Sequence, residues 1–291
     1  DANQVATHSI EARAKTLESF ARKAARPLNG DPESPKYANP LSQITDLAGV
    51  RVITFFLEGV DGVSAVIERE FDVIEKTNKS SLLAEEERLG YQSIHYLVRL
   101  SDARASLAEY RRFQGLTAEV QVRTILQHAW AEIEHDIQYK SVEALPTSIR
   151  RRFLALAGLL EIGDREFQAI AEEDRGVRLN ASRLIEEGRL QEVELTPDSL
   201  KLYLNRKYGP DGRMGDWNYG WNARALKRLG FANLKQVDDC VAAYDDDRLS
   251  RLFWGSRQGQ LQRFEDVLMV AMGENHRYWS EHPFAGAPWF E

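Results

Sequence analysis

The chain has 291 residues, of which 43% are hydrophobic and 29% are charged. This composition is typical of a soluble globular protein and excludes wholesale disorder. The difference between 38 basic and 45 acidic side chains is −7, which argues against broad coating of nucleic acid but leaves room for a local basic pocket.

Cysteine usage and hydropathy exclude two further classes of protein. Cys240 is the one cysteine, so neither a disulfide scaffold nor a cysteine-rich zinc site is expected. The sequence contains no run of about 18 apolar residues and no visible secretion signal. We therefore expect a cytoplasmic protein that does not use a membrane.

The first predicted element is a strand over residues 9–15. Small or apolar side chains alternate there with charged ones, and this period places Arg13 and Lys15 on one strand face. Thr16 is a suitable N-cap for a helix over residues 17–26. Together with Arg13 and Lys15, Ser19 and Lys23 in the first turns of this helix form a compact basic site. A solvated charged face is the alternative interpretation.

The following pattern predicts alternating strands and helices up to about residue 140. A proline-rich loop is expected over 28–41, strands over 49–56, 72–75, 91–100 and 116–123, and helices over 60–71, 124–140, 146–173 and 179–188. Residues 76–89 are polar and predict a mobile segment. The fold class is therefore predicted as α+β, with a helical region after the sheet.

The C-terminal region differs from the rest in composition. Five of the six tryptophans follow residue 215, which indicates a separate helical unit. We expect domains over residues 1–190 and 191–291. Residues 226–237 are typical of a small helix-turn-helix pair, with plain helical packing as the alternative.

Two motifs combine carboxylates or histidine with a strand. Asp46 stands just before a predicted strand that carries Arg51, an arrangement that suits a divalent metal beside phosphates. Tyr91 and His95 lie on one face of a later strand, about 13 Å apart at 3.3 Å per residue. They are suited to a base and a phosphate of one nucleotide, or alternatively to ordinary packing.

A third motif, Glu119-Val-Gln-Val-Arg123, alternates in the same way. Glu119, Gln121 and Arg123 therefore share a strand face, and Glu119 is a candidate metal ligand or base.

Together these motifs, over residues 9–141, resemble the synthetase domain of the RelA/SpoT homologue family, the alarmone synthetases. The stretch from Trp130 to Lys140 is similar to the closing helix of that domain. The resemblance implies a nucleotidyltransferase-like mixed β-sheet flanked by helices. It also implies a Mg²⁺-dependent transfer of pyrophosphate from ATP to the 3′-hydroxyl of GDP or GTP, with release of AMP.

The resemblance assigns roles to residues of this sequence. Arg13, Lys15, Ser19, Lys23 and Arg51 would bind ATP, Asp46 and Glu119 would bind Mg²⁺ and act in catalysis, and Tyr91, His95, Gln121, Arg123 and Arg88 would bind the acceptor. Such a chain would act on nucleotides as its main partners and possess no hydrolase domain ahead of the first motif. A homo-oligomer is a further expectation.

The acceptor motif departs from the family in two positions. Members that use guanine nucleotides commonly carry Lys and Asn where this chain has Glu87 and Leu89, although Arg88 restores some charge. This leaves open an acceptor of another kind, either the 3′ end of transfer RNA or an adenine nucleotide. A member of that kind would be a toxin, for which an antitoxin protein would be a partner.

Two other functions are weighed against the transferase. His128, Glu132 and His135 share a helix face and are candidates for a metal hydrolase site, but their spacing lacks the pattern of a zinc protease. The second alternative function is a nucleotide sensor without turnover. The pair Asp46 and Glu119 argues against it, since a protein that only binds nucleotides does not need two carboxylates near phosphates.

Overall fold

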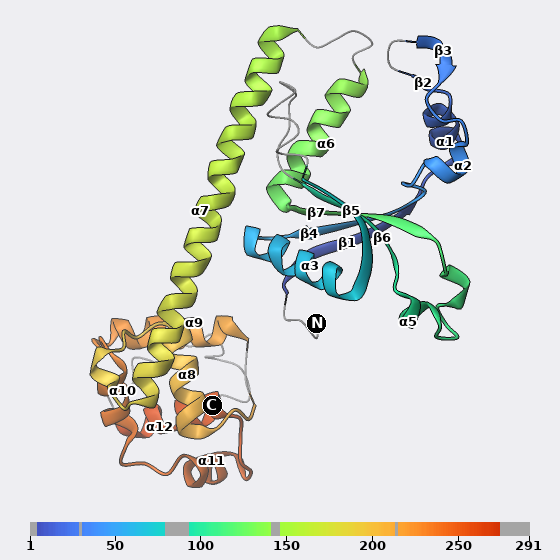
Figure 1. Ribbon diagram of the computed structural model, residues 1–291. Coiled ribbons are helices and arrows are strands. Elements are labelled where there is room, and N and C mark those ends of the chain that lie inside the picture. Colours follow the sequence, from blue (N-terminus) through green and yellow to red (C-terminus); the bar gives the residue numbers. More distant parts are fainter. Residues whose placement is uncertain (1–4, 29–30, 79–92, 141–145, 213–214, 274–291) are drawn as a thin grey trace. The chain divides into compact units, whose positions relative to one another are not determined.

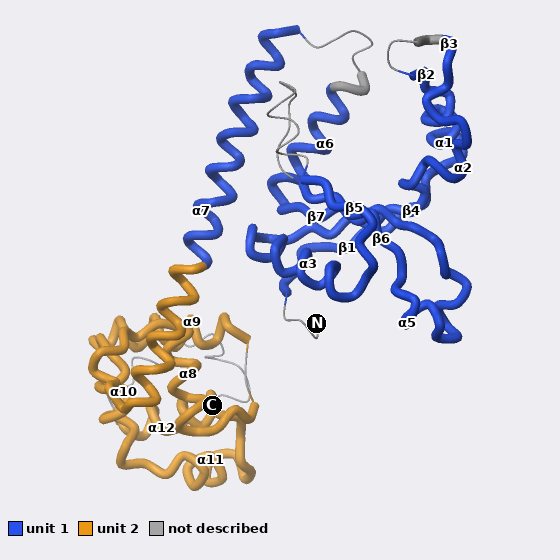
Figure 2. The backbone as a smooth tube through the Cα atoms, in the orientation of Figure 1, with its two compact units in different colours: residues 1–171 blue, residues 172–291 orange. Residues whose placement is uncertain are grey.

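The computed structural model describes residues 5–28, 31–78, 93–140, 146–212 and 215–273 (Figure 1). The chain divides into two compact units, residues 1–171 and 172–291 (Figure 2). The domain boundary expected at residue 190 stays a prediction. Among the described residues, no helix has the length and apolar character needed to cross a membrane.

The first unit is built on a five-stranded mixed sheet. Its strands lie in the order β1 (Thr7–Ala14), β4 (Ala48–Thr54), β7 (Thr117–Thr124), β6 (Ile94–Leu100) and β5 (Phe71–Asn78). β4 and β7 pair in parallel, whereas the other three pairs are antiparallel. The predicted α+β class with a mixed sheet is confirmed.

The two faces of this sheet differ in chemistry because side chains alternate along each strand. Val52, Val120, Val122 and Tyr96 point to one face and pack against helix α3 (Leu57–Glu70) in an apolar core. In the register of the strands, the residues between them point to the opposite face, and these are mostly charged or polar. One sheet therefore carries both the core and a polar surface.

The segment between β1 and β4 contains more structure than the expected loop. Helix α1 (Leu17–Ala24) begins at Thr16, whose Oγ1 accepts the backbone N–H of Ser19, as predicted. The prediction of a loop over 28–41 is wrong, because β2 (Pro27–Leu28) pairs with β3 (Asp31–Pro35) and helix α2 (Pro40–Gln43) follows. Proline is tolerated at both positions, in the edge strands of a small two-stranded sheet and at the first position of a helix.

Short elements link β6 to β7, and helices follow the sheet. Helix α5 (Asp102–Ala105) and the 3₁₀ helix η1 (Arg111–Phe113) connect the two strands. β7 leads directly into α6 (Ile125–Lys140), whose Trp130 packs edge-to-face on Phe153 of the next helix.

Helix α7 (Thr147–Glu186) is a single helix of 40 residues where the sequence predicts two, so this prediction is wrong. The expected break at 174–178 contains Gly176, and an interior glycine costs about 1 kcal/mol without ending a helix. The ion pair between Arg178 and Asp174 also spans this point at 2.8 Å. The helix instead ends shortly before Gly188, which has a φ of 76°.

The second unit is a cluster of helices around its own core. After η2 (Leu190–Glu192), these are α8 (Pro197–Tyr208), α9 (Asp216–Arg228), α10 (Leu234–Val241), α11 (Asp246–Trp254) and α12 (Gln260–Met272). Leu226, Leu234 and Val237 of the α9–α10 pair are fully buried in that core. Their burial favours plain helical packing for this pair.

The central strand gives a test of the described core. Val122→Ala removes two buried methyl groups between β7 and α3, and we expect the free energy of unfolding to fall by about 2–3 kcal/mol. Ile10→Ala, at a position that is 66% exposed on the edge strand β1, should change it by less than about 0.5 kcal/mol. Urea denaturation followed by circular dichroism measures both, and equal losses in the two variants would contradict the assigned core.

Candidate functional site

The candidate site lies on the polar face of the sheet, where strand register brings distant residues into rows. Glu11 pairs with Arg51, and Arg13 pairs with Gly49, between β1 and β4. The rows continue across the sheet. Gly49 lies opposite Glu119, Arg51 lies opposite Gln121, and Gln121 lies opposite His95. Four strands therefore contribute side chains to one surface.

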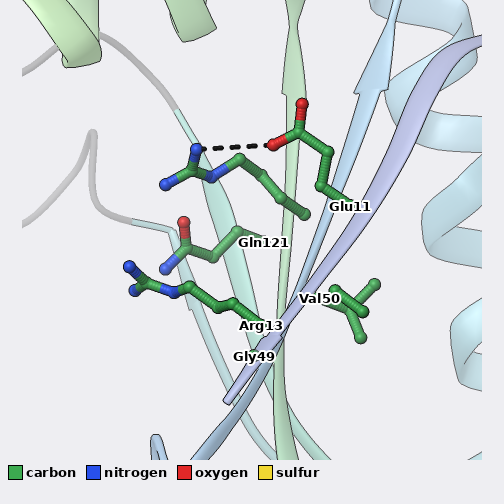
Figure 3. Close-up of a pocket in the computed structure, with 7 residues that line it drawn as sticks. Glu11, Arg13, Gly49, Val50 and Gln121 are labelled. Atoms are coloured by element: carbon green, nitrogen blue, oxygen red, sulfur yellow. Dashed lines mark ion pairs between the residues drawn. The ribbon is translucent and has the colours of Figure 1, made fainter. Parts of the chain in front are cut away.

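A hollow of about 380 Å³, open to solvent, lies over β1, β4 and β7. It is lined by Glu11, Ala12, Arg13, Gly49, Val50, Arg51 and Gln121. The side chains of Arg13 and Gln121 extend to one side of the sheet and Val50 extends to the other (Figure 3). Gly49 leaves room for Arg13, since a Cβ on Gly49 would lie 3.4 Å from the Arg13 side chain.

Arg51 is held between two carboxylates. Its Nη1 atom lies 3.0 Å from Oε1 of Glu132 on α6 and 3.6 Å from Oε2 of Glu11 on β1 (the latter pair is dashed in Figure 3). Glu132 also lies 3.8 Å from Nδ1 of His128, one turn earlier on the same helix. Helix α6 therefore contributes negative charge to an arginine-rich surface.

Arg123 is the buried cation of the site. Its guanidinium donates a hydrogen bond to Gln121, and its Nε atom is buried without a partner. Burial and the positive charges of Arg51 and Arg13 together lower the pKa of Arg123 to about 10, although Glu132 and Glu119 act in the opposite direction. Because the charged form is disfavoured in this way, an anion placed among these arginines would be stabilising.

A second cluster forms at the N-terminal side of β4. Lys15 and Lys23 both contact Oδ2 of Asp46, at 2.9 and 3.0 Å, while the backbone N–H of Lys15 bonds to the carbonyl of Leu47. Burial alone would raise the pKa of Asp46, but the two lysine contacts outweigh it and the net pKa is lowered. The other oxygen, Oδ1, is buried without a hydrogen-bond partner.

A third group joins β6 to β7. The Nδ1 atom of His95 lies 2.7 Å from Oε1 of Glu119, and its Nε2 atom lies 3.0 Å from Oγ of Ser93. With Glu119 ionised, the carboxylate only accepts and Nδ1 donates, and in a neutral imidazole Nε2 then accepts from the Ser93 hydroxyl. This chain of bonds fixes the orientation of Glu119.

The structure thus places most of the predicted site residues in three groups. Arg13, Arg51, Gln121 and Arg123 share the hollow and its border, Lys15, Lys23 and Asp46 form the cluster before β4, and His95 pairs with Glu119. The backbone N–H of Ser19 belongs to the cap of α1. Tyr91 and Arg88 lie outside the described residues. The assigned roles stay predictions.

Sequence analysis missed two members of this surface. Glu11 alternates with Arg13 and could have been found from the same period of two. Glu132 was grouped with His128 and His135 as a candidate metal site, whereas its carboxylate contacts Arg51. Over the described parts of the chain, no three or more His, Cys, Asp or Glu side chains are arranged to hold a metal ion.

Comparison with known proteins finds similarity over most of the first unit. Residues 12–144 match the family model described as the region found in RelA / SpoT proteins. GTP pyrophosphokinase YwaC of Bacillus subtilis (strain 168) is 27% identical over 163 residues, which cover 56% of this chain and 73% of that protein. GTP pyrophosphokinase YjbM of the same organism is 25% identical over 179 residues, 60% of this chain and 76% of that protein.

Solved structures of similar proteins include small alarmone synthetase 1 from Bacillus subtilis bound to its product pppGpp. It is 23% identical, covers 57% of this chain and 79% of its own, and has a TM-score of 0.44. A GTP pyrophosphokinase family protein from Streptococcus pneumoniae is 24% identical, with coverages of 58% and 78% and a TM-score of 0.46.

The electrostatics of the site can be tested through His128. Burial lowers its pKa below 6.5, Glu132 acts in the opposite direction, and Arg123 and Arg51 add to the lowering. Glu132→Gln should therefore lower the pKa of His128 further. Histidine ring resonances followed by NMR between about pH 4.5 and 8 measure this shift, with His128→Gln as the assignment and Glu134→Gln as the matched control. A rise of the pKa in Glu132→Gln would contradict the arrangement.

Proposed function

We propose that residues 12–144, which match the RelA/SpoT family model, form a pyrophosphokinase domain, and that this chain transfers pyrophosphate from ATP to the 3′-hydroxyl of GDP or GTP. The observation that supports this proposal is the concentration of five basic side chains on one sheet face and its border, with Asp46 and Glu119 among the carboxylates beside them. A polyphosphate donor needs cations, and an alcohol acceptor needs a base.

The arginines of the hollow are suited to the triphosphate of ATP. Arg13 and Arg51 line the hollow, and Arg123 lies beside Gln121 at its edge. Charge-assisted hydrogen bonds from guanidinium groups to phosphate are among the strong ones in proteins. Arg51 would exchange its contact with Glu132 for a phosphate oxygen, and Lys15 and Lys23 would bind at the border.

The carboxylates fit Mg²⁺ by the chemistry of their oxygens. Mg²⁺ is usually held by one or two carboxylates together with waters and substrate phosphates. Asp46 retains a buried Oδ1 without a partner, which is the kind of oxygen that a hard cation takes. Glu119 would be the second ligand, and a bound Mg²⁺ would neutralise charge on the triphosphate.

Glu119 is also the proposed base. Its hydrogen bond from His95 at 2.7 Å holds the carboxylate in one orientation. Glu119 would accept the proton of the 3′-hydroxyl as that oxygen forms a bond to the β-phosphorus of ATP. The bond between this phosphorus and the oxygen bridging to the α-phosphate breaks, and AMP leaves with the electron pair.

His95, Gln121 and Arg123 would contact the acceptor, together with Tyr91 and Arg88. Register places His95 opposite Gln121, one row from Glu119, so a ribose bound at this row would present its hydroxyls to the base. Tyr91 would stack on the acceptor base, which is worth about 1–3 kcal/mol and tolerates any base. Discrimination between acceptors must then come from the neighbours of Tyr91.

A second acceptor class is favoured by Glu87 and Leu89, which replace the Lys and Asn that are common in guanine-nucleotide enzymes of this family. A carboxylate beside a 5′-diphosphate is unfavourable by about 1–4 kcal/mol, depending on solvent exposure. A transfer RNA end, whose 5′ side is a diester, or an adenine nucleotide is the alternative acceptor. A member that used transfer RNA in this way would be a toxin with an antitoxin partner.

The two carboxylates give the first functional test. Asp46→Ala and Glu119→Ala should each lower the rate of AMP release by about 10³-fold or more, because each removes a metal ligand and Glu119 also removes the base. Glu109→Ala, on the β6–β7 connection, is the matched control and should retain the wild-type rate. Circular dichroism checks that each variant is folded, and near-wild-type turnover in either would show that the assignment is wrong.

The acceptor preference is tested by reversing one charge. Glu87→Lys should increase kcat/KM for GDP or GTP relative to transfer RNA by about tenfold or more, since it replaces repulsion by attraction. Glu85→Lys makes the same charge change two residues earlier and should have a smaller effect. If the wild-type chain uses GDP or GTP efficiently and Glu87→Lys changes nothing, the guanine-nucleotide reaction stands and the second acceptor class is rejected.

A further inference from the structure

Asp164 is a buried acidic residue on the part of α7 that belongs to the first unit. It is 3% exposed, and its Oδ2 atom accepts a hydrogen bond of 2.7 Å from the hydroxyl of Thr124. Burying a carboxyl group costs free energy that its hydrogen bonds must offset. Apolar packing of α7 in this unit is already supplied by Phe153 and Ala157, which are buried with Trp130. A directional bond at this depth adds what such packing lacks, a fixed position for Thr124.

Thr124 joins strand β7 to helix α6. Its Oγ1 atom accepts the backbone N–H of Gln127 at 3.1 Å, and Oε1 of Gln127 accepts the backbone N–H of Thr124 at 2.8 Å. This reciprocal pair is a capping box, which fixes the first turn of a helix. Because Oγ1 accepts from Gln127, the hydroxyl proton of Thr124 goes to Asp164. Helix α6 therefore starts from a buried chain of hydrogen bonds that ends on α7.

The same face of α7 holds the helix that follows the neighbouring strand. Thr54 at the end of β4 lies opposite Thr124 in the parallel pair, and α3 begins shortly after it. Gln168 lies one turn after Asp164, and its Oε1 atom accepts the backbone N–H of Glu58 in the first turn of α3 at 3.1 Å. Two side chains of α7 thus bind at the starts of the two helices that leave adjacent parallel strands.

The candidate site depends on where α6 starts. His128 and Glu132 lie one and two turns after Thr124, and Glu132 contacts Arg51 at 3.0 Å. Arg123, the buried cation, directly precedes Thr124. A shift of the first turn of α6 would therefore change both the contact of Glu132 with Arg51 and the backbone position of Arg123. Misplacement of about 1 Å is enough to lower the rate of an enzyme strongly.

We propose that Asp164 is a positioning residue of the site, which holds the start of α6 through Thr124 and so keeps Arg123 and Glu132 in place around Arg51. Its effect on rate rests on the proposed pyrophosphate transfer. Its effect on the position of α6 is measured without substrate, so the two can fail separately.

The first experiment follows the pKa of His128 by NMR in the full chain. Asp164→Ala should raise this pKa toward 6.5, because burial is the main cause of its lowering and a displaced first turn exposes the ring. Loss of a negative charge without movement would lower the pKa instead. Thr124→Val changes no charge and should also raise it. Glu166→Ala, which removes an exposed carboxylate from the same helix, is the matched control and should leave the pKa unchanged.

The second experiment measures kcat for pyrophosphate transfer at a temperature where circular dichroism shows each variant folded. Asp164→Ala and Thr124→Val should each lower kcat by about tenfold or more, through misalignment. Lower stability alone would not change kcat of the folded chain. Asp164→Asn retains an oxygen that accepts from Thr124 and should keep kcat within about threefold of the wild type. The double variant of Asp164→Ala and Thr124→Val should lose no more than the worse single variant, because both remove one bond.

Three results would overturn the proposal. They are a pKa of His128 that stays the same or falls in both folded variants, a raised pKa with the kcat of the wild type, and losses of kcat that multiply in the double variant. If Asp164→Ala does not fold, Thr124→Val is nearly isosteric and carries both measurements. If the wild-type chain transfers pyrophosphate to no acceptor, the proposed function fails, and the titration alone decides whether Asp164 places α6.

Discussion

The crowding of positive charge on one face of a single mixed sheet is the constraint on which the rest of the site depends. Arg123 is buried beside Arg51 and Arg13, and its pKa is lowered by burial and by these neighbours. Such a surface is stable only where carboxylates offset the charge. Glu132 from α6 does so for Arg51, and Asp46 does so for two lysines at the border. The apolar face against α3 holds the strands in the register that this arrangement needs.

The same balance explains how the site would accept a polyanion. Each neutralising carboxylate belongs to a different element from its cation, so a phosphate group can replace it without unfolding a strand. Substrate phosphates would therefore compete with the protein carboxylates for the same basic side chains. Salt would weaken the interaction of both groups with these side chains. The carboxylates of Asp46 and Glu119 differ from Glu132 because the proposed reaction needs them as ligand and base. The second unit has its own core.

The sequence predicted the elements whose signals are local. Strand alternation placed Arg13 on β1 and Glu119, Gln121 and Arg123 on one face of β7, and the order of the motifs was sufficient to find the RelA/SpoT resemblance, which the comparisons confirm. The sequence did not predict which helices and strands contact one another. Glu132 contacts Arg51 only because α6 turns back over the sheet after β7. Helix α7 is continuous because it contains no strong helix breaker, although the local composition predicted a break.

The central claim is that this surface binds a polyphosphate donor and transfers two of its phosphates. The most direct measurement is incubation of the chain with Mg²⁺ and ATP labelled in its β- and γ-phosphates, against GDP, GTP, AMP, ATP and transfer RNA in parallel. We predict that label appears on at least one acceptor and that one AMP is released for each acceptor labelled. Release of ADP and inorganic phosphate instead, or no AMP with any acceptor, would contradict the account.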